Sequence, residues 1–197
     1  MLTLSAIVIG AYLLGSISTA ILVSRVLKLS DPRDVGSGNP GATNVLRYAG
    51  KKAAAVTLLG DAVKGVIPVI AGRSLGIESP ELTLVAAAAF CGHLFPIYYG
   101  FKGGKGVATF LGVNLALAPM VGLIFILTWL LTAGATRYSS LGALVATLIV
   151  PIAAWYAGEP MAALLIYAAM GALIFWRHAS NIANLMRGDE KKIGQKS

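Results

Sequence analysis

Charged residues are scarce in this chain. Only 12% of its 197 residues are Asp, Glu, Lys or Arg, whereas 57% are hydrophobic and the mean hydropathy is +0.78. A soluble domain of this length carries roughly twice that charged fraction. The composition instead predicts helices in a lipid bilayer, because a helix satisfies its own backbone hydrogen bonds there. We therefore expect an all-α, polytopic membrane bundle made of a single domain, residues 1–197.

Cysteine and clustered metal ligands are also missing from the sequence. Cys91 is the one cysteine, so the chain forms neither an internal disulfide nor a thiol redox pair. No His, Cys, Asp and Glu residues have the spacing of a metal site, and eight acidic residues are few for a two-metal phosphotransferase. The sequence thus predicts no metal and no other cofactor, and it predicts no nucleic-acid partner.

The N-terminus lacks the basic segment of a cleaved signal peptide. Residues 1–24 carry no charge, and the stretch 2–22 matches a span of roughly 20 residues, so we interpret it as a retained first helix. The other candidate spans are about 53–72, 82–99, 107–118, 120–135, 139–157 and 161–176.

The uncharged segment 107–136 is too long for one span. A single helix over these 30 residues would measure about 45 Å against a hydrocarbon core of about 30 Å, and Pro119 interrupts its hydrogen bonds near the middle. Two helices would each be shorter than a usual span. Hydropathy alone therefore leaves both choices open.

The positions of Lys and Arg favour two helices there. With seven spans, fourteen of the sixteen Lys and Arg residues share one face, while Lys64 lies within a span and Arg73 on the other face. Cytoplasmic loops are enriched in Lys and Arg, so we expect seven transmembrane helices, with the N-terminus outside and the C-terminus inside. The cytoplasmic segments would be the loops at about 25–52, 101–106 and 137–138 and the tail 177–197.

A first polar stretch on that face runs from Gly36 to Asn44 and is followed by Arg47. Three glycines within six residues let backbone N–H groups approach an anion closely. Thr43 or Asn44 would cap a short following helix, whose N-terminus also favours phosphate. The alternative is a flexible turn between two helices.

A second stretch, Phe101–Gly106, places two lysines on a glycine-rich loop. It is not an ATP-binding P-loop, because Gly106 rather than Ser or Thr follows Lys105, and Tyr99 stands where the leading glycine is required. We expect an anion site here. The alternative is that Lys102 and Lys105 only anchor the loop at the inner membrane surface.

A third stretch, Arg177–Ile182, follows the last span. On a continuing helix His178 and Asn181 would share a face, and an imidazole beside an amide can orient a hydroxyl or a phosphate oxygen. The alternative is that these polar side chains only extend from the end of the span to the membrane–water interface. The connection 137–140 is a weaker fourth element.

Two ionisable residues of the second span, Asp61 and Lys64, are three positions apart. Such residues are costly in a membrane and usually face the interior of the bundle, so we expect a mutual ion pair. For His93, in the third span, two interpretations stay open. It either lines the polar site or hydrogen-bonds a carbonyl.

These segments resemble the three cytoplasmic motifs of the bacterial acyl-phosphate-dependent glycerol-3-phosphate acyltransferases, the PlsY family. The matching segments are 36–44, 92–109 and 178–182, with 11–16 also fitting. The resemblance implies transfer of a fatty acyl group from acyl phosphate to the 1-hydroxyl of sn-glycerol 3-phosphate, giving lysophosphatidate and phosphate in phospholipid synthesis. It also implies a bacterial cytoplasmic (inner) membrane protein whose site faces the cytoplasm, with an acyl-phosphate-producing enzyme as functional neighbour.

By motif matching, the resemblance makes Ser37, His178 and Asn181 catalytic candidates. Arg47 would hold phosphate with its planar fork and Lys105 with a point charge. The other substrate-binding candidates are Gly38, Asn39, Gly41, Thr43, Asn44, Lys102, Gly103 and Gly104.

The sequence also limits the mechanism. Neither histidine is followed by the Asp of a His-x4-Asp pair, and Ser37 is not in a Gly-x-Ser-x-Gly turn. We therefore expect direct acyl transfer without an acyl-enzyme. The rival functions are a transporter or flippase for a phosphorylated solute, against which no inverted repeat is visible, and a lipid-binding scaffold.

Overall fold

The computed structural model describes residues 2–195, which form helices and connecting loops with no strand among them. Residues 1, 196 and 197 lie outside the described residues. Residue 196 is Lys196, one of the lysines in the predicted cytoplasmic tail 177–197. The elements are α1 (Leu2–Gly15), α2 (Thr19–Val26), α3 (Ala42–Ser74), α4 (Glu81–Leu94), η1 (Ile97–Tyr99), α5 (Val107–Leu117), α6 (Pro119–Thr136), α7 (Ser139–Tyr156), α8 (Met161–Arg177) and α9 (Ala179–Arg187).

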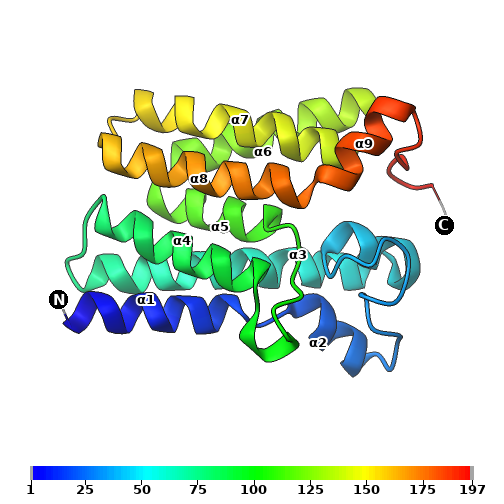
Figure 1. The fold of residues 1–197 in the computed structure, drawn as a ribbon, viewed down its shortest axis with the longest axis horizontal. Helices are drawn as coiled ribbons and strands as arrows, with labels where there is room; N and C mark the ends of the chain where they lie inside the picture. The colour runs from blue at the N-terminus through cyan, green and yellow to red at the C-terminus, as the bar shows by residue number, and fades with distance from the viewer. Residues whose placement is uncertain (1, 196–197) are drawn as a thin grey trace.

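The long helices lie side by side along the long axis of the molecule (Figure 1). The two ends of the chain lie at opposite ends of this bundle (Figure 1). The short helices α2 and α9 lie near the C-terminal end, which we call the α9 end (Figure 1). Phe90, Phe110 and Phe125 join α4, α5 and α6 in the main core, with ring centroids 5.8 Å apart in each neighbouring pair.

Small residues let the helices approach closely. A Cβ at Gly92 would overlap the carbonyl oxygen of Tyr12, where α4 meets α1. A Cβ at Gly112 would likewise overlap the carbonyl oxygen of Ala62, where α5 meets α3. Close backbone approach at small residues is the usual packing of helices in membranes, so this arrangement suits the apolar composition.

Four helical segments are long and apolar enough to cross a membrane: α3, Glu81–Tyr99, α6 and α7. The number rises to six if α1 with α2, bent by 42°, and α8 with α9, bent by 58°, each count as one span. The helix α5 is apolar but shorter. The all-α, multi-span fold is thus confirmed, whereas the count of seven spans and the orientation stay predictions.

The choice of two helices for 107–136 is confirmed. Ala118 has an extended backbone (φ −142°, ψ 94°) between α5 and α6, and Pro119 is the first residue of α6. A Cβ at Gly122 would lie 2.6 Å from Cδ2 of Leu115, so the two helices fold back on each other at this break.

The prediction of one continuous first helix over 2–22 is wrong, because α1 and α2 are separate. Ser16 Oγ donates to a carbonyl one turn earlier at 2.8 Å, and Ser18 Oγ accepts from a backbone N–H of α2 at 3.4 Å. Lys64 Nζ donates to the carbonyl of Ile17 at 2.6 Å. These side chains satisfy the backbone groups that the break exposes, so the helix can end inside an apolar stretch.

The predicted loop 25–52 is partly helical. The helix α3 begins at Ala42 and bends at Gly50, whose φ of 83° lies in the left-handed region. The expected short helix therefore exists, but Gly41 rather than Thr43 or Asn44 is its N-cap.

The predicted tail 177–197 also contains a helix, α9. Its axis turns by 58° from that of α8, and His178 lies between the two helices. The expectation that His178 and Asn181 share one continuing helix is therefore wrong.

Candidate active site

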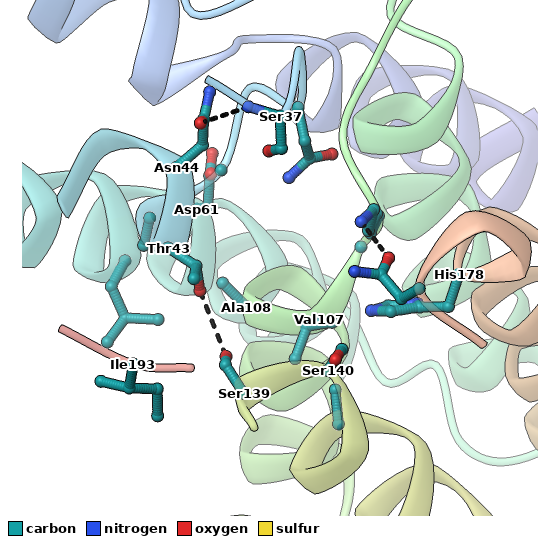
Figure 2. A pocket seen from close by; sticks show the side chains of 18 of the residues that line it. Ser37, Thr43, Asn44, Asp61, Val107, Ala108, Ser139, Ser140, His178 and Ile193 are labelled. Carbon is teal, nitrogen blue, oxygen red and sulfur yellow. Dashed lines mark hydrogen bonds between the residues drawn. The ribbon is translucent and has the colours of Figure 1, made fainter. Parts of the chain in front are cut away.

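A cavity of about 160 Å³ lies at the α9 end of the bundle, between α3, α5, α7 and α9 (Figure 2). Nine of the thirteen candidate site residues line it: Ser37, Asn39, Gly41, Thr43, Asn44, Arg47, Lys105, His178 and Asn181. The structure does not bring four others to its wall: Gly38, Lys102, Gly103 and Gly104. Among these, Lys102 is exposed and both Gly103 and Gly104 are buried.

The side chain of Asn44 organises the first glycine-rich loop. Its Oδ1 accepts from the backbone N–H of Ser37 at 2.9 Å, and its Nδ2 donates to the carbonyls of Pro32 and Val35 at 2.9 and 3.0 Å. Asn44 is 1% exposed. Because its amide is occupied by the loop, Asn44 holds Ser37 at the cavity wall (Figure 2).

The second glycine-rich loop is held by hydrogen bonds to neighbouring residues. Arg177 donates from Nη2 to the carbonyl of Gly103 at 2.6 Å and from Nε to that of Gly104 at 3.1 Å. The N–H of Gly104 donates to the carbonyl of His93 at 3.2 Å. The two glycines thus position Lys105, which does reach the cavity.

Lys105 belongs to a chain of polar contacts across the cavity. Its Nζ donates to Oδ1 of Asn181, and Nδ2 of Asn181 donates to Oε1 of Glu190 at 2.7 Å. The same carboxylate oxygen accepts from Ser140 Oγ at 2.5 Å. Burial lowers the pKa of Lys105 to about 8, although the nearby Glu190 carboxylate opposes the shift.

His178 is 3% exposed and has a defined tautomer. Its Nδ1 lies 2.8 Å from the carbonyl oxygen of Ile174, and a carbonyl can only accept, so Nδ1 carries the proton. Burial lowers the pKa of His178 to about 4, and the ring is neutral at neutral pH. Its Nε2 therefore has a free lone pair that can accept a hydrogen bond from a hydroxyl.

Two intramembrane residues also reach the cavity. Asp61 and His93 line it, and the predicted ion pair of Asp61 with Lys64 is confirmed at 2.8 Å. Of the two interpretations left open for His93, the structure supports the one in which it lines the site. The sequence predicted Asp61 only as the partner of Lys64 in an ion pair, and nothing in the sequence placed it near the loops.

Sequence reasoning missed the part of the tail that follows α9. Glu190 and Ile193 line the cavity. The N–H of Ile193 donates to the carbonyl of Arg137 at 2.7 Å, and Arg137 Nη2 donates back to the carbonyl of Ile193 at 3.2 Å.

Thr43 and Ser139 also share a hydrogen bond at 3.2 Å (Figure 2). The connection 137–140 is therefore part of the site, as the sequence suggested only weakly.

The cavity is lined by both charged and apolar side chains. Arg47, Lys105 and Lys191 supply positive charge. The apolar lining residues are Leu58, Val107, Ala108, Trp129, Ala143 and Ile193. Within residues 2–195 no three His, Cys, Asp or Glu side chains are close enough together to hold a metal ion. The arrangement suits a small phosphorylated molecule beside an apolar chain.

Comparison with known proteins extends this description. The family model described as glycerol-3-phosphate acyltransferase matches residues 5–188. The glycerol-3-phosphate acyltransferase of Thioalkalivibrio sulfidiphilus is 53% identical over 204 aligned residues, which cover 100% of this chain and 97% of the relative. The one of Paraburkholderia phytofirmans is 49% identical, with 96% and 91% covered.

Two crystal structures are similar over nearly the whole chain. They are the glycerol 3-phosphate form and the lysophosphatidic acid form of PlsY, an integral membrane glycerol 3-phosphate acyltransferase. The TM-scores are 0.92 and 0.89, and both are 44% identical in sequence. Each alignment covers 98% of this chain and 96% of the other.

Proposed function

The chain belongs to the glycerol-3-phosphate acyltransferase family, and we propose that it transfers a fatty acyl group from acyl phosphate to the 1-hydroxyl of sn-glycerol 3-phosphate. The products are lysophosphatidate and phosphate. The family predicted from the motifs is confirmed, and the protein is an acyltransferase of phospholipid synthesis in a membrane. The acyl phosphate donor, the residue roles and the topology below are part of the proposal.

The observation that carries the proposal is that one cavity is lined by both cationic and apolar side chains. Arg47 and Lys105 are among the cationic ones, and Leu58 and Trp129 are among the apolar ones. An acyl phosphate combines the same two characters, since its anionic head is joined to an apolar tail. Glycerol 3-phosphate is small and doubly anionic, so the cationic side chains suit it as well as the head of the donor.

Within this cavity, Arg47 and Lys105 bind phosphate groups through charge-assisted hydrogen bonds. Asn39, Gly41 and Thr43 line the same wall and contribute polar contacts to the substrates. Gly38 does not line the cavity, and its N–H donates to the carbonyl of Val35 at 3.0 Å, so its part is to shape the loop whose glycines allow close approach to an anion.

His178 and Asn181 orient the attacking hydroxyl, with the lone pair on Nε2 of His178 as its acceptor. A histidine with a pKa of about 4 is a weak base, so a phosphate oxygen of the substrate takes the proton as the hydroxyl attacks. Acyl phosphate already carries a good leaving group, and alignment of the two substrates supplies much of the acceleration. Ser37 at the cavity wall is placed to contact the reacting groups.

We further propose that the site faces the cytoplasm of a bacterial inner membrane, in a bundle of seven spans with the N-terminus outside. The positions of Lys and Arg support this orientation. The short helix α5 is the doubtful span by length, at about 1.5 Å per residue. Its buried residues, among them Phe110 and Val113, pack inside the bundle, so it need not match the bilayer thickness by itself. An acyl-phosphate-producing enzyme supplies the donor at the same face.

Purified protein incubated with acyl phosphate and labelled glycerol 3-phosphate tests the proposal. We expect labelled lysophosphatidate and one phosphate per product, and no product when acyl phosphate is replaced by the free fatty acid. Absence of lysophosphatidate from well-folded protein contradicts the proposal. Uptake of labelled glycerol 3-phosphate into sealed vesicles without acyl transfer would instead identify a transporter.

A further inference from the structure

Asp61 of α3 lines the cavity and lies close to residues of two other helices, α2 and α4. Its Oδ1 lies 2.8 Å from Nζ of Lys64, 3.4 Å from the backbone N of Thr19 in α2, and 3.8 Å from Nδ1 of His93 in α4. Asp61 is 1% exposed, and Lys64 and His93 are 5% and 6% exposed. Buried charges inside a membrane bundle are costly, so this arrangement needs a reason.

Charge compensation explains Lys64 but not His93. Lys64 neutralises Asp61 and also donates to the carbonyl of Ile17, at the break between α1 and α2. His93 Nδ1 is buried without a hydrogen-bond partner among the described residues, and the nearest carboxylate oxygen is that of Asp61. Asp61 and His93 line the cavity, whereas Lys64 does not. The pair that faces the cavity is therefore Asp61 with His93.

His93 supports the second glycine-rich loop in two ways. Its carbonyl oxygen accepts from the N–H of Gly104 at 3.2 Å. Its ring fills the space next to Gly104, where a Cβ would overlap Nε2. The next residue is Lys105, whose amino group reaches Asn181 across the cavity. A displaced imidazole would therefore move the loop and, with it, Lys105.

We propose that Asp61 and His93 are positioning residues for phosphate binding. The Asp61 carboxylate attracts the imidazole of His93 across 3.8 Å, the imidazole packs against Gly104, and the backbone at Gly104 sets the position of Lys105, whose amino group meets the anion. The ligand chemistry is a phosphate group, which glycerol 3-phosphate, acyl phosphate and inorganic phosphate share. The inference deepens the proposed function and rests on it only for the identity of the natural anion.

A double-mutant cycle between His93 and Gly104 tests the contact. The readouts are the Kd of the purified protein for inorganic phosphate, the KM for glycerol 3-phosphate and the Tm. We expect Gly104→Ala to raise the Kd by about 10-fold in the wild type, because the methyl group displaces the ring. In a His93→Ala background we expect less than about a 2-fold effect from Gly104→Ala, because no ring is left to displace. Equal effects in both backgrounds would overturn the proposal. If His93→Ala does not fold, His93→Gln takes its place in the cycle.

The role of Asp61 is tested by replacing both partners of the ion pair, as Asp61→Asn with Lys64→Gln. This neutral pair removes the carboxylate without leaving a lone charge, while the glutamine amide can still donate to the carbonyl of Ile17 and the asparagine oxygen can still accept from the N–H of Thr19. We expect a Tm close to that of the wild type and a phosphate Kd raised by about 10-fold. An unchanged Kd would mean that Asp61 only compensates charge, and a variant that fails to fold would show that its role is structural.

Asn114→Ala is the matched control. Asn114 is a fully buried amide of α5 that donates to the carbonyl of Phe110 and does not line the cavity. We expect no change in phosphate Kd from its removal, whatever the change in Tm. Because phosphate binding is measured apart from turnover, the two proposals fail separately. Coupling without lysophosphatidate would contradict only the function, and lysophosphatidate without coupling would contradict only the positioning role.

Discussion

Lys105 and Asn181, 76 positions apart in the chain, are joined by a hydrogen bond from Nζ to Oδ1. This bond links the second glycine-rich loop to α9. Asn181 in turn donates to Glu190, so the position of the lysine depends on α9 and on the segment that follows it. The surroundings of this cationic side chain are therefore built by segments that meet only in the folded protein.

Lys105→Ala and Arg47→Ala should each lower kcat/KM for glycerol 3-phosphate by roughly 10- to 150-fold. A charge-assisted contact to phosphate contributes about 1.5–3 kcal/mol, and each substitution removes one. Steady-state kinetics of the purified variants measure the effect. Lys102→Ala is the control, since Lys102 is exposed and does not line the cavity, and it should change kcat/KM by less than about 2-fold. Near-normal kinetics of both cavity variants would rule out the assignment.

Lys105 should produce an alkaline limb in the pH profile. Its pKa is lowered to about 8, so the fraction of charged amine, and with it phosphate affinity, falls as the pH rises through 8. The KM for glycerol 3-phosphate should therefore increase between pH 7.5 and 9, by up to about 10-fold per pH unit once the amine is mostly neutral. In Lys105→Arg the side chain stays charged, so this limb should disappear even if the activity is lower. An unchanged limb in that variant would assign it to another group.

His178 should contribute no acidic limb in the neutral range. With a pKa of about 4, it is neutral from pH 7 down to about 5 and gains its proton only below that. We expect kcat of the wild type to show no histidine titration near pH 6.5. His178→Ala should lower kcat by about 100-fold with a smaller effect on KM, because the lost contact orients the hydroxyl. A large increase in KM with unchanged kcat would mean that His178 binds substrate and does not orient the attack.

Cys91→Ser should retain most of the activity. The thiol is only partly buried in α4, and Cys91 does not line the cavity. Direct transfer also predicts that no stable acyl label forms on the protein when acyl phosphate is supplied without acceptor, as mass spectrometry can check. Activity should survive a metal chelator. A folded but inactive Cys91→Ser, or a stoichiometric acyl label, would point to covalent catalysis.

The orientation can be mapped with single cysteines in the Cys91→Ser background. Leu75, Met161 and Met186 are 59%, 68% and 84% exposed, so a cysteine at each site is accessible. We expect Leu75→Cys and Met161→Cys to react with an impermeant reagent added outside intact cells. Met186→Cys should react only after permeabilisation. Labelling of position 186 in intact cells would reverse the model.

The helices were largely predictable from the sequence, because apolar runs and charge positions limit where spans can lie. The break at Pro119 followed from the length of an uncharged run and one proline. The break between α1 and α2 did not, since Ser16 and Ser18 are uncharged and two serines in a long apolar run do not interrupt a predicted span. It depends on the side chain of Lys64, which reaches Ile17 from another helix.

The site was predictable in composition but not in geometry. Motif matching proposed both Lys102 and Lys105 as substrate-binding residues, yet only Lys105 lines the cavity. The directions of loop side chains depend on backbone angles, and Gly100 and Phe101 both have left-handed φ values, 62° and 61°. Glu190 could not be found either, since two adjacent carboxylates in a polar tail have no spacing pattern that indicates a site. Its role appears only when α9 turns back over the bundle.

The contact of the tail with the connection at Arg137 also determines when the cavity becomes complete during synthesis of the chain. Ribosomes release a polypeptide from its N-terminus onward, and early segments fold first where they can. This cavity needs Ser37 near one end of the chain and Ile193 near the other. A nascent chain that has threaded its first helices into the bilayer thus holds only half of the anion site. Substrate capture has to wait until residue 193 has been synthesised, so an unfinished chain in the translocon cannot sequester acyl donors from finished enzymes.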